Sequence, residues 1–311
     1  MIFLITGGAG FLGSALANRL SGDGHEVRVI DDLSAGEVER LDEKVLFTRG
    51  DVNDRPKLWT LLQDVECVYH LAARVSVPQS VLYPREYNAV NVGGTVSVME
   101  AMRDAGVKRV VLTSSGAIYG EQSTQPLREN MVPNPDSPYA VGKLSAEYYV
   151  RTIGILWGLE TVALRIFNTY GPGQPLPASH PPVVSRFLKC AASGESIIIY
   201  GNGKQTRDYV YISDVIDALT AAATAKTVSQ SVINVGSGVA LSLNDLVRAV
   251  SKIMNMTLDP IYNNSESGGV REMCSDIGEA KNKLRYQPRV SISEGLKRTI
   301  SVDKRFHQQL Y

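Results

Sequence analysis

The sequence predicts an α/β protein built on a doubly wound parallel sheet, with a smaller α+β lobe. In the first half, short apolar runs alternate with segments whose apolar residues have helical spacing. After Arg165 the sequence is richer in turn-forming residues and the alternation becomes irregular. Strands that alternate with helices are joined by right-handed crossovers, which produce a parallel sheet covered on both faces. The first half therefore predicts the sheet, and the second half predicts the lobe.

The strands and helices of the sheet domain can be assigned in order along the chain. Apolar runs of strand length are expected to be buried strands, and they lie at 2–5, 27–30, 45–48, 68–71, 110–113 and 161–164. Apolar residues at helical spacing predict helices between these strands, at 11–21, 54–63, 86–105 and 138–156.

The expected second lobe begins with Asn168-Thr-Tyr-Gly-Pro-Gly-Gln-Pro-Leu-Pro, which is rich in turn-forming residues. Helical and strand-like segments then mix up to a helical stretch from Ser293. We expect this lobe to close over the carboxyl edge of the sheet, where such folds bind ligands. The expected domains are 1–166 with 208–236 for the sheet, and 167–207 with 237–311 for the lobe.

Composition and charge exclude several classes of protein. Lys plus Arg and Asp plus Glu are 32 each, which leaves no basic footprint for nucleic acid. No apolar run reaches the roughly 18 residues needed to span a bilayer, and the N-terminus lacks the features of a signal peptide. Cys67, Cys190 and Cys274 lie far apart, which favours a reducing compartment over a disulfide or metal framework. We expect a cytoplasmic protein without a metal.

A glycine-rich turn follows the first strand directly and opens the first helix: Gly7-Gly-Ala-Gly10-Phe11-Leu12-Gly13. Glycines permit a tight turn and a close approach of the backbone to a pyrophosphate, and the helix N-terminus offers free N–H groups to it. The position between a strand and a helix is typical of the Rossmann dinucleotide-binding fold. The sequence therefore predicts a dinucleotide site.

Asp31 ends the second strand, about 20 residues beyond the glycines, where an acid hydrogen-bonds a ribose 2′-hydroxyl. A carboxylate there repels a 2′-phosphate, so NAD is favoured over NADP. Asp32 could play this role instead of Asp31, or it could be a solvated turn residue without a role in binding. We favour Asp31.

Tyr139 and Lys143 lie four residues apart at the start of an expected helix, with Ser137 as its N-cap and Pro138 in its first turn. A phenol with a pKa of about 10 is a poor base, but a nearby ammonium and a cationic nicotinamide ring would both lower that pKa. The alternative is an aromatic residue that packs beside a surface lysine. The position after a strand that ends at Ser115 favours the catalytic interpretation.

Together these motifs resemble the extended short-chain dehydrogenase/reductase family, in its sugar-nucleotide epimerase and dehydratase branch. The resemblance covers nearly the whole chain. Further motifs that carry it are Gly50-Asp51-Val52, His70-Leu-Ala-Ala73, Asn91-Val-Gly-Gly-Thr95, Ser114-Ser-Gly-Ala-Ile-Tyr-Gly120, Leu164-Arg-Ile-Phe-Asn168, Tyr200-Gly-Asn-Gly-Lys-Gln-Thr-Arg207 and Asn234-Val-Gly-Ser-Gly238.

The resemblance implies roles for individual residues. Tyr139 is the expected catalytic base, Lys143 holds the nicotinamide ribose, and Ser115 hydrogen-bonds the reacting hydroxyl of the sugar. Asn168 and Arg207 are expected to bind the nucleotide diphosphate. The alternative for Arg207 is that it forms a surface ion pair with the neighbouring Asp208. The remaining expected NAD contacts are Asp51, Val52, Leu71, Ala72, Ala73 and Thr113. We assign His70 no role, because it ends a buried strand and is expected to be packed.

One second-lobe segment departs from the family pattern. Glu266 stands where many members carry a phosphate-binding arginine, so either Arg271 replaces it or one contact is missing. Asp276 has two alternatives, a residue facing the nucleotide or a helix cap. Met273 falls where related 4-epimerases set the size of the sugar pocket, which favours plain hexoses over N-acetyl sugars.

The expected reaction is 4-epimerisation of a UDP-hexose, UDP-glucose or UDP-galactose. Dehydratases and decarboxylases of this branch carry acids after the fifth strand, where this chain has Gly116 and Ala117. Alternatives are epimerisation of a UDP-N-acetylhexosamine or UDP-uronic acid, an NAD-dependent sugar-nucleotide oxidoreductase, and a non-enzymatic dinucleotide sensor.

The resemblance also implies a homodimer, in which helices 86–105 and 138–156 pair with their copies in a four-helix interface. Apolar positions on these helices that support this interface are Val92, Val96, Met99, Leu144 and Tyr148.

Overall fold

The computed structural model describes residues 1–264 and 270–307 and confirms the predicted doubly wound parallel sheet. The central sheet has seven strands in the order β10-β6-β5-β4-β1-β2-β3, each parallel to its neighbours. The strands are β1 (Ile2–Thr6), β2 (Glu26–Asp31), β3 (Leu46–Arg49), β4 (Cys67–His70), β5 (Arg109–Ser115), β6 (Glu160–Ile166) and β10 (Ser231–Val235). The seventh strand, β10, is absent from the strands that we predicted.

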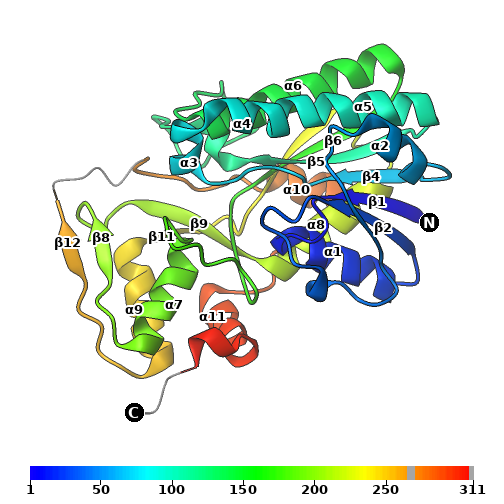
Figure 1. The fold of residues 1–311 in the computed structure, drawn as a ribbon. Helices are drawn as coiled ribbons and strands as arrows, with labels where there is room; N and C mark the ends of the chain where they lie inside the picture. Colours follow the sequence, from blue (N-terminus) through cyan, green and yellow to red (C-terminus); the bar gives the residue numbers. More distant parts are fainter. Residues whose placement is uncertain (265–269, 308–311) are drawn as a thin grey trace.

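Helices cover both faces of this sheet (Figure 1). One face carries α1 (Phe11–Gly22) and α8 (Ile212–Thr224), and the other carries α2 (Arg55–Leu61), α5 (Gly94–Ala105) and α6 (Pro138–Trp157). Successive side chains of a strand point to opposite faces. On β1, Phe3 and Ile5 accordingly join one buried apolar cluster, and Leu4 joins the other.

The helix predicted at 86–105 is present, but it begins at Pro84 and contains a π-helical turn. It consists of α4 (Pro84–Asn88), a π-helical turn η2 (Ala89–Gly93) and α5, and it is preceded by α3 (Val77–Leu82). At the π turn, Asn91 accepts a hydrogen bond from the Arg74 N–H (2.8 Å) and donates one to the Arg74 carbonyl (3.0 Å). Met99 is fully buried within the subunit, so it is not available to an interface.

The smaller lobe contains a three-stranded sheet of β7 (Asn168–Tyr170), β9 (Thr206–Tyr211) and β11 (Ala240–Ser242), and a pair of β8 (Ile198–Tyr200) with β12 (Ile261–Asn263). The expected domain boundary at 207/208 lies inside β9. The helices of the smaller lobe are α7 (Val183–Ser193), α9 (Leu243–Met254) and α11 (Ile292–Val302). Helix α10 (Gly278–Leu284) packs on β10 and α8. The short helical turns are η1 (Val38–Arg40), η3 (Gly116–Tyr119) and η4 (Lys304–Phe306).

Asp208 joins β9 to the central sheet. Its buried carboxylate accepts five hydrogen bonds, from the Ser237 N–H and hydroxyl, the Gly238 N–H, and the Ser275 N–H and hydroxyl. The alternative interpretation of Arg207 and Asp208 as a surface ion pair is therefore wrong, because Asp208 is fully buried and bonded elsewhere.

Candidate active site and cofactor cleft

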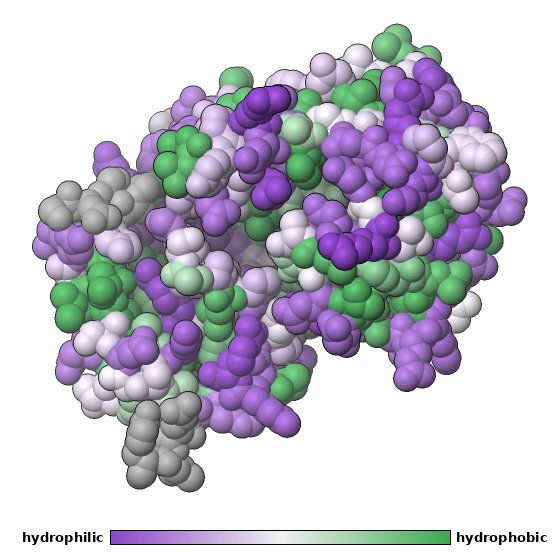
Figure 2. All heavy atoms as spheres, in the orientation of Figure 1, coloured by the Kyte–Doolittle hydropathy of each residue, from purple (hydrophilic) through white to green (hydrophobic). Residues whose placement is uncertain are grey.

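A cleft of about 620 Å³ opens at the carboxyl edge of the sheet, where the strand order reverses between β1 and β4. The surface is hollowed where this edge meets the smaller lobe (Figure 2). Most of the residues predicted for the site line it: Gly7, Gly10, Phe11, Leu12, Gly13, Asp31, Asp51, Val52, Leu71, Ala72, Ala73, Thr113, Ser115, Tyr139, Lys143 and Asn168.

The glycine turn has the geometry that a pyrophosphate site requires. Gly7 has φ +70°, and a Cβ atom on it would lie 2.7 Å from Ala72 Cα. A Cβ on Gly13 would lie 2.1 Å from the Gly7 carbonyl oxygen. Helix α1 begins without a side-chain cap and without an acidic residue in its first turn. Its first N–H groups thus remain available to a phosphate, so these residues fit a dinucleotide.

Asp31 is buried beneath the glycine turn and lines the cleft. Its carboxylate accepts hydrogen bonds from the N–H groups of Ala9 (3.0 Å) and Leu33 (2.9 Å). Burial raises the pKa of Asp31, and these two backbone hydrogen bonds oppose the shift. Asp32, its rival, is exposed and accepts a hydrogen bond from the Ser34 N–H within its own turn.

Tyr139 and Lys143 lie on the first turns of α6, which begins as predicted with Ser137 as N-cap and Pro138 in the first turn. The Lys143 ammonium donates to the Thr113 carbonyl oxygen (2.8 Å), and burial lowers its pKa to about 8. Burial raises the pKa of Tyr139, and its hydrogen bond with Ser115 opposes that shift. The expected lowering of the Tyr139 pKa is therefore not produced by the protein's own groups, because desolvation outweighs them.

A buried ionic network lies directly behind Ser115. The Arg165 guanidinium on β6 forms an ion pair with the Glu147 carboxylate on α6 (2.7 Å), and both side chains are almost completely buried. The Ser114 hydroxyl donates to the same carboxylate (3.0 Å), and Arg165 also donates to the Tyr119 hydroxyl (2.8 Å). The network therefore ties the end of β5 to the helix that carries Tyr139.

His70, by contrast, has a packing role. Its ring nitrogens contact the hydroxyls of Thr6 (2.7 Å) and Thr95 (2.9 Å), and burial lowers its pKa to about 3. It is therefore neutral at ordinary pH. The three cysteines are free, and Cys67 is buried.

Of the residues predicted to bind the substrate from the second lobe, Asn168 lines the cleft, whereas Arg207, Arg271 and Met273 are not among its lining residues. Asn168 is exposed at the start of β7 and lines the cleft. Arg207 is half-buried, donates to the carbonyl oxygens of Thr206 (2.8 Å) and Val270 (2.7 Å), and has its pKa lowered by burial. Arg271 is exposed, and its carbonyl oxygen accepts from the Thr206 N–H (2.8 Å). These two arginines are therefore adjacent to one another on the lobe side.

Met273 is buried in a small core behind the cleft, and Phe167 of the same core lines the cleft. Any effect of Met273 on the sugar pocket must therefore pass through its neighbours. Asp276 accepts from the Gly278 N–H (2.8 Å) in the turn before α10 and pairs with Arg128; it does not line the cleft, and the N-cap of α10 is Ile277. Glu266 lies outside the described residues.

Sequence reasoning missed a loop, residues 171–182, that we call the strap. It follows β7 and contributes five lining residues to the cleft: Gln174, Pro175, Pro177, His180 and Pro182. Its abundant glycine and proline indicated only a turn. Arg74, which follows the Ala72-Ala73 pair directly, also lines the cleft and was overlooked.

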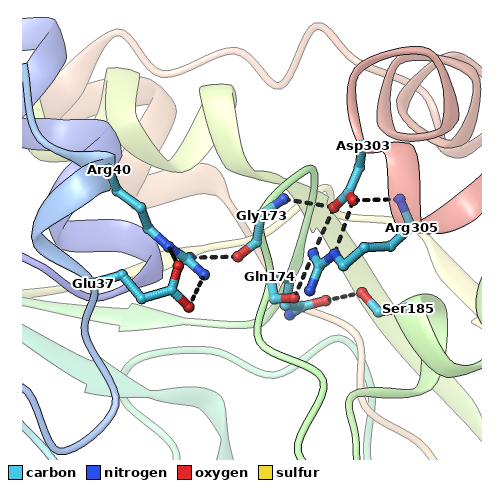
Figure 3. A network of polar contacts seen from close by, with 7 residues as sticks. All are labelled: Glu37, Arg40, Gly173, Gln174, Ser185, Asp303 and Arg305. Carbon is cyan, nitrogen blue, oxygen red and sulfur yellow. Dashed lines mark hydrogen bonds and ion pairs between the residues drawn. The ribbon is translucent and has the colours of Figure 1, made fainter.

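Two segments that are distant in sequence, η1 and the C-terminal segment, hold the strap in place (Figure 3). From η1, Arg40 Nη1 donates to the Gly173 carbonyl oxygen (2.5 Å). From the C-terminal segment, Asp303 accepts from the Gly173 N–H (2.9 Å), and Arg305 donates to the Gln174 carbonyl oxygen (2.9 Å). Because η1 follows the Asp31 turn closely, the strap links the adenosine side of the cleft to the far end of the chain.

The described residues contain no group of three or more His, Cys, Asp or Glu side chains placed to hold a metal ion. Within the same residues, no helix combines the length and apolar character that crossing a membrane requires.

Fold and site together define a dinucleotide-binding enzyme with a Tyr-x-x-x-Lys pair. Residues 3–236 match the model of the NAD dependent epimerase/dehydratase family, and the chain belongs to this family, whose cofactor is NAD. It is 38% identical over 304 residues to a UDP-glucose 4-epimerase of Mycolicibacterium smegmatis, with 96% of each chain covered.

Solved structures agree with this assignment. The UDP-glucose 4-epimerase of Thermotoga maritima, solved with UDP-glucose, has a TM-score of 0.92 and 37% identity, covering 97% of this chain and 98% of that one. The UDP-glucuronic acid 4-epimerase of Bacillus cereus, in complex with UDP-glucuronic acid and NAD, has a TM-score of 0.90 and 30% identity, covering 99% and 100%.

Replacing Asp31 with alanine is expected to weaken NAD binding and to reduce the preference for NAD over NADP. The reason is that the substitution removes the acceptor for the ribose and the charge that repels a 2′-phosphate. Titration calorimetry of both cofactors against wild type, Asp31→Ala and the control Asp42→Ala, which alters an exposed acid outside the cleft, measures this preference. Tighter binding of NADP than NAD by wild type would contradict the assignment.

Proposed function

We propose that this protein interconverts the C4 epimers of a UDP-hexose, UDP-glucose and UDP-galactose, through a transient 4-keto sugar. The single observation that carries the proposal is the set of Tyr139, Ser115 and Lys143 at one cleft that also fits a dinucleotide. NAD, when bound, supplies a reversible hydride acceptor. Asp51 and Val52 would flank its adenine, and Lys143 would hold its nicotinamide ribose.

The chain's own residues would manage the proton and the position of the sugar. Tyr139 takes the proton of the C4 hydroxyl and returns it, while Ser115 hydrogen-bonds the same oxygen. Because burial raises the pKa of Tyr139, its phenolate needs positive charge beside it in the complex. Asn168 and Arg207 hold the diphosphate, so binding energy from the nucleotide leaves the sugar ring free to turn over.

The distribution of acids favours epimerisation over dehydration. Among the described residues that line the cleft, the carboxylates are Asp31, Asp32 and Asp51, which belong to the adenosine side. Gly116 and Ala117 supply no acid or base beside Ser115. Removal of a carbon-bound proton at C5 therefore lacks a carboxylate base, whereas hydride transfer from and to C4 needs only Tyr139 and the cofactor.

Epimerisation of UDP-glucose in deuterated water tests this proposal. The hydrogen leaves C4 as hydride and returns as hydride, so the product is expected to carry no deuterium at C4 or C5. Nuclear magnetic resonance of the product measures it. Deuterium at C5 would indicate deprotonation beside the ketone, and no epimer from any UDP-sugar of a panel would contradict the proposal outright.

The panel also distinguishes the remaining candidates. Similar relatives act on UDP-glucose, and others on UDP-glucuronate or UDP-N-acetylglucosamine, so plain, N-acetylated and uronic sugars are all compared. We rank the plain hexose first. A net accumulation of reduced cofactor with an oxidised sugar product would indicate an oxidoreductase instead, and cofactor binding without turnover would indicate a sensor.

We further propose a homodimer formed through α5 and α6. On α6, apolar side chains remain largely exposed, namely Val141, Tyr148, Tyr149, Ile155 and Leu156. Val92, Val96 and Leu144 are half-buried. Light scattering at micromolar concentration is expected to give twice the subunit mass of 33.8 kDa; a monomer would contradict the proposal.

A further inference from the structure

A buried histidine, His70, immediately precedes a segment of the cleft wall. Residues 71–74 follow it directly, and all four line the cleft. The Ala72 N–H donates to the Thr6 hydroxyl oxygen (3.3 Å), and the same hydroxyl contacts His70 Nδ1 (2.7 Å). A Cβ atom on Gly7 would lie 2.7 Å from both the N and the Cα of Ala72. Because the two backbones approach so closely, a shift of Ala72 would change the shape of the glycine turn.

The hydrogen bonds around His70 decide which ring nitrogen carries the hydrogen. Nε2 contacts the Thr95 hydroxyl (2.9 Å), and this hydroxyl donates to the Asn91 carbonyl oxygen (2.7 Å), one helical turn earlier. A hydroxyl has a single hydrogen to donate, so Thr95 accepts from His70, and Nε2 carries the ring hydrogen. Because burial lowers the pKa of His70 to about 3, the ring is neutral. Its Nδ1 is then an acceptor, to which the Thr6 hydroxyl donates.

The opposite tautomer would leave buried groups unpaired. With the hydrogen on Nδ1, the Thr6 hydroxyl would receive two donors, and its own hydrogen would lack an acceptor within residues 1–264 and 270–307. Thr95 would have to donate to Nε2 and would lose the Asn91 carbonyl oxygen. Thr6, His70 and Thr95 are all buried, where an unpaired polar group is costly. Only the Nε2–H tautomer therefore satisfies every group of the chain.

The backbone of His70 is connected to the opposite side of the cleft. Its carbonyl oxygen accepts from the Thr113 hydroxyl (3.3 Å), and the Thr113 carbonyl oxygen accepts from the Lys143 ammonium (2.8 Å). His70 thus lies between the glycine turn, which it reaches through Thr6, and Lys143, which it reaches through Thr113. It is not itself among the described residues that line the cleft.

We propose that His70 is a positioning residue for NAD, which acts through Thr6 and Ala72 as the neutral ring with its hydrogen on Nε2. Because the Thr6 hydrogen points to Nδ1, the lone pairs of the hydroxyl oxygen remain available to the Ala72 N–H. The ring thereby fixes the cleft wall against the glycine turn. This role goes beyond packing, since a residue that only filled space would not require one tautomer. It also does not depend on which sugar reaction follows.

The test compares two matched variants, Thr6→Val and Thr95→Val. Each removes one buried hydroxyl that contacts His70, but only the Thr6 hydroxyl also holds the Ala72 N–H. Mass spectrometry measures how fast bound NAD exchanges for isotopically labelled NAD in the absence of sugar. We expect Thr6→Val to speed this exchange by about 5- to 100-fold, because a buried donor loses its acceptor. Thr95→Val is expected to exchange NAD at the wild-type rate.

Two substitutions of the histidine itself complete the test. His70→Leu removes the acceptor of the Thr6 hydrogen and is expected to speed NAD exchange in the same direction as Thr6→Val. The side-chain oxygen of asparagine can replace Nδ1 as that acceptor, so His70→Asn is expected to exchange NAD more slowly than His70→Leu. Nuclear magnetic resonance of wild type labelled in its four histidines shows the tautomer directly, and the His70 signals are those missing from His70→Asn.

Two results would overturn the inference. The first is a His70 hydrogen on Nδ1 in wild type, a measurement that requires no variant to fold. The second is equal NAD exchange in Thr6→Val and Thr95→Val, which would reduce His70 to a packing residue. Urea denaturation of both variants shows whether the two lost hydroxyls cost the same stability. None of these readouts requires sugar turnover, so a failure of the proposed epimerisation would leave this test intact.

Discussion

Replacing Tyr139 with phenylalanine is expected to lower kcat by at least about 10²- to 10⁴-fold, which is the usual contribution of a general acid–base group. The substitution removes the hydroxyl that exchanges a proton with the C4 oxygen in the proposed reaction. It keeps the ring that fills the cleft and leaves the glycine turn intact, so NAD is expected to remain bound. Steady-state turnover and the cofactor content of the purified protein measure the two effects separately.

Tyr148→Phe is the matched control, because Tyr148 is an exposed phenol on the same helix. Its turnover is expected to equal that of wild type. If Tyr139→Phe retained more than a tenth of the wild-type kcat, another group would have to act as the base. A loss of bound NAD together with activity would instead indicate that the hydroxyl supports cofactor binding.

Replacing Arg165 with methionine is expected to lower the free energy of unfolding by about 3–5 kcal/mol, the cost of leaving one charge of a buried ion pair uncompensated. The Glu147 carboxylate is fully buried and, among the residues that the structure describes, would keep only the Ser114 hydroxyl as a partner. Hydrogen bonds with Glu147 raise the pKa of Arg165 although burial opposes the shift. Urea denaturation followed by circular dichroism measures the change.

Glu160→Gln supplies the control, since it breaks the ion pair of Glu160 with Arg109, in which the carboxylate is 53% exposed. Exposed pairs contribute about 0–1 kcal/mol, so this variant is expected to unfold close to wild type. Equal stability of Arg165→Met and Glu160→Gln would mean that the buried network contributes nothing beyond a surface pair.

The sequence predicted six of the central strands because each is a short, continuous apolar run. Strand β10 was not predicted because Asn234 interrupts its apolar run. Asn234 is nevertheless fully buried, because its amide hydrogen-bonds the Tyr119 hydroxyl and the Leu127 carbonyl. The π turn between α4 and α5 was not predicted for a similar reason. At this turn Asn91 hydrogen-bonds the backbone of Arg74, a contact that helical spacing does not record.

The motifs that carry their own chemistry come together in the structure. The glycine turn, Asp31 and the pair of Tyr139 and Lys143 all lie at one cleft. Residues whose position depends on tertiary packing were harder to predict. Met273 proves to lie behind the cleft wall, and Arg74 gains its place only from the π turn.

The hydrogen bonds that hold the strap bear on the residence time of the dinucleotide in the cleft. Arg40, Asp303 and Arg305 fasten it from two regions that are distant in sequence, so opening it means breaking several hydrogen bonds together. A dehydrogenase must exchange its nicotinamide after every cycle and would be slowed by such a fastening. An enzyme that returns the hydride to the same sugar has no such need. We therefore expect the dinucleotide to behave here as a prosthetic group, with a residence time that spans many turnovers.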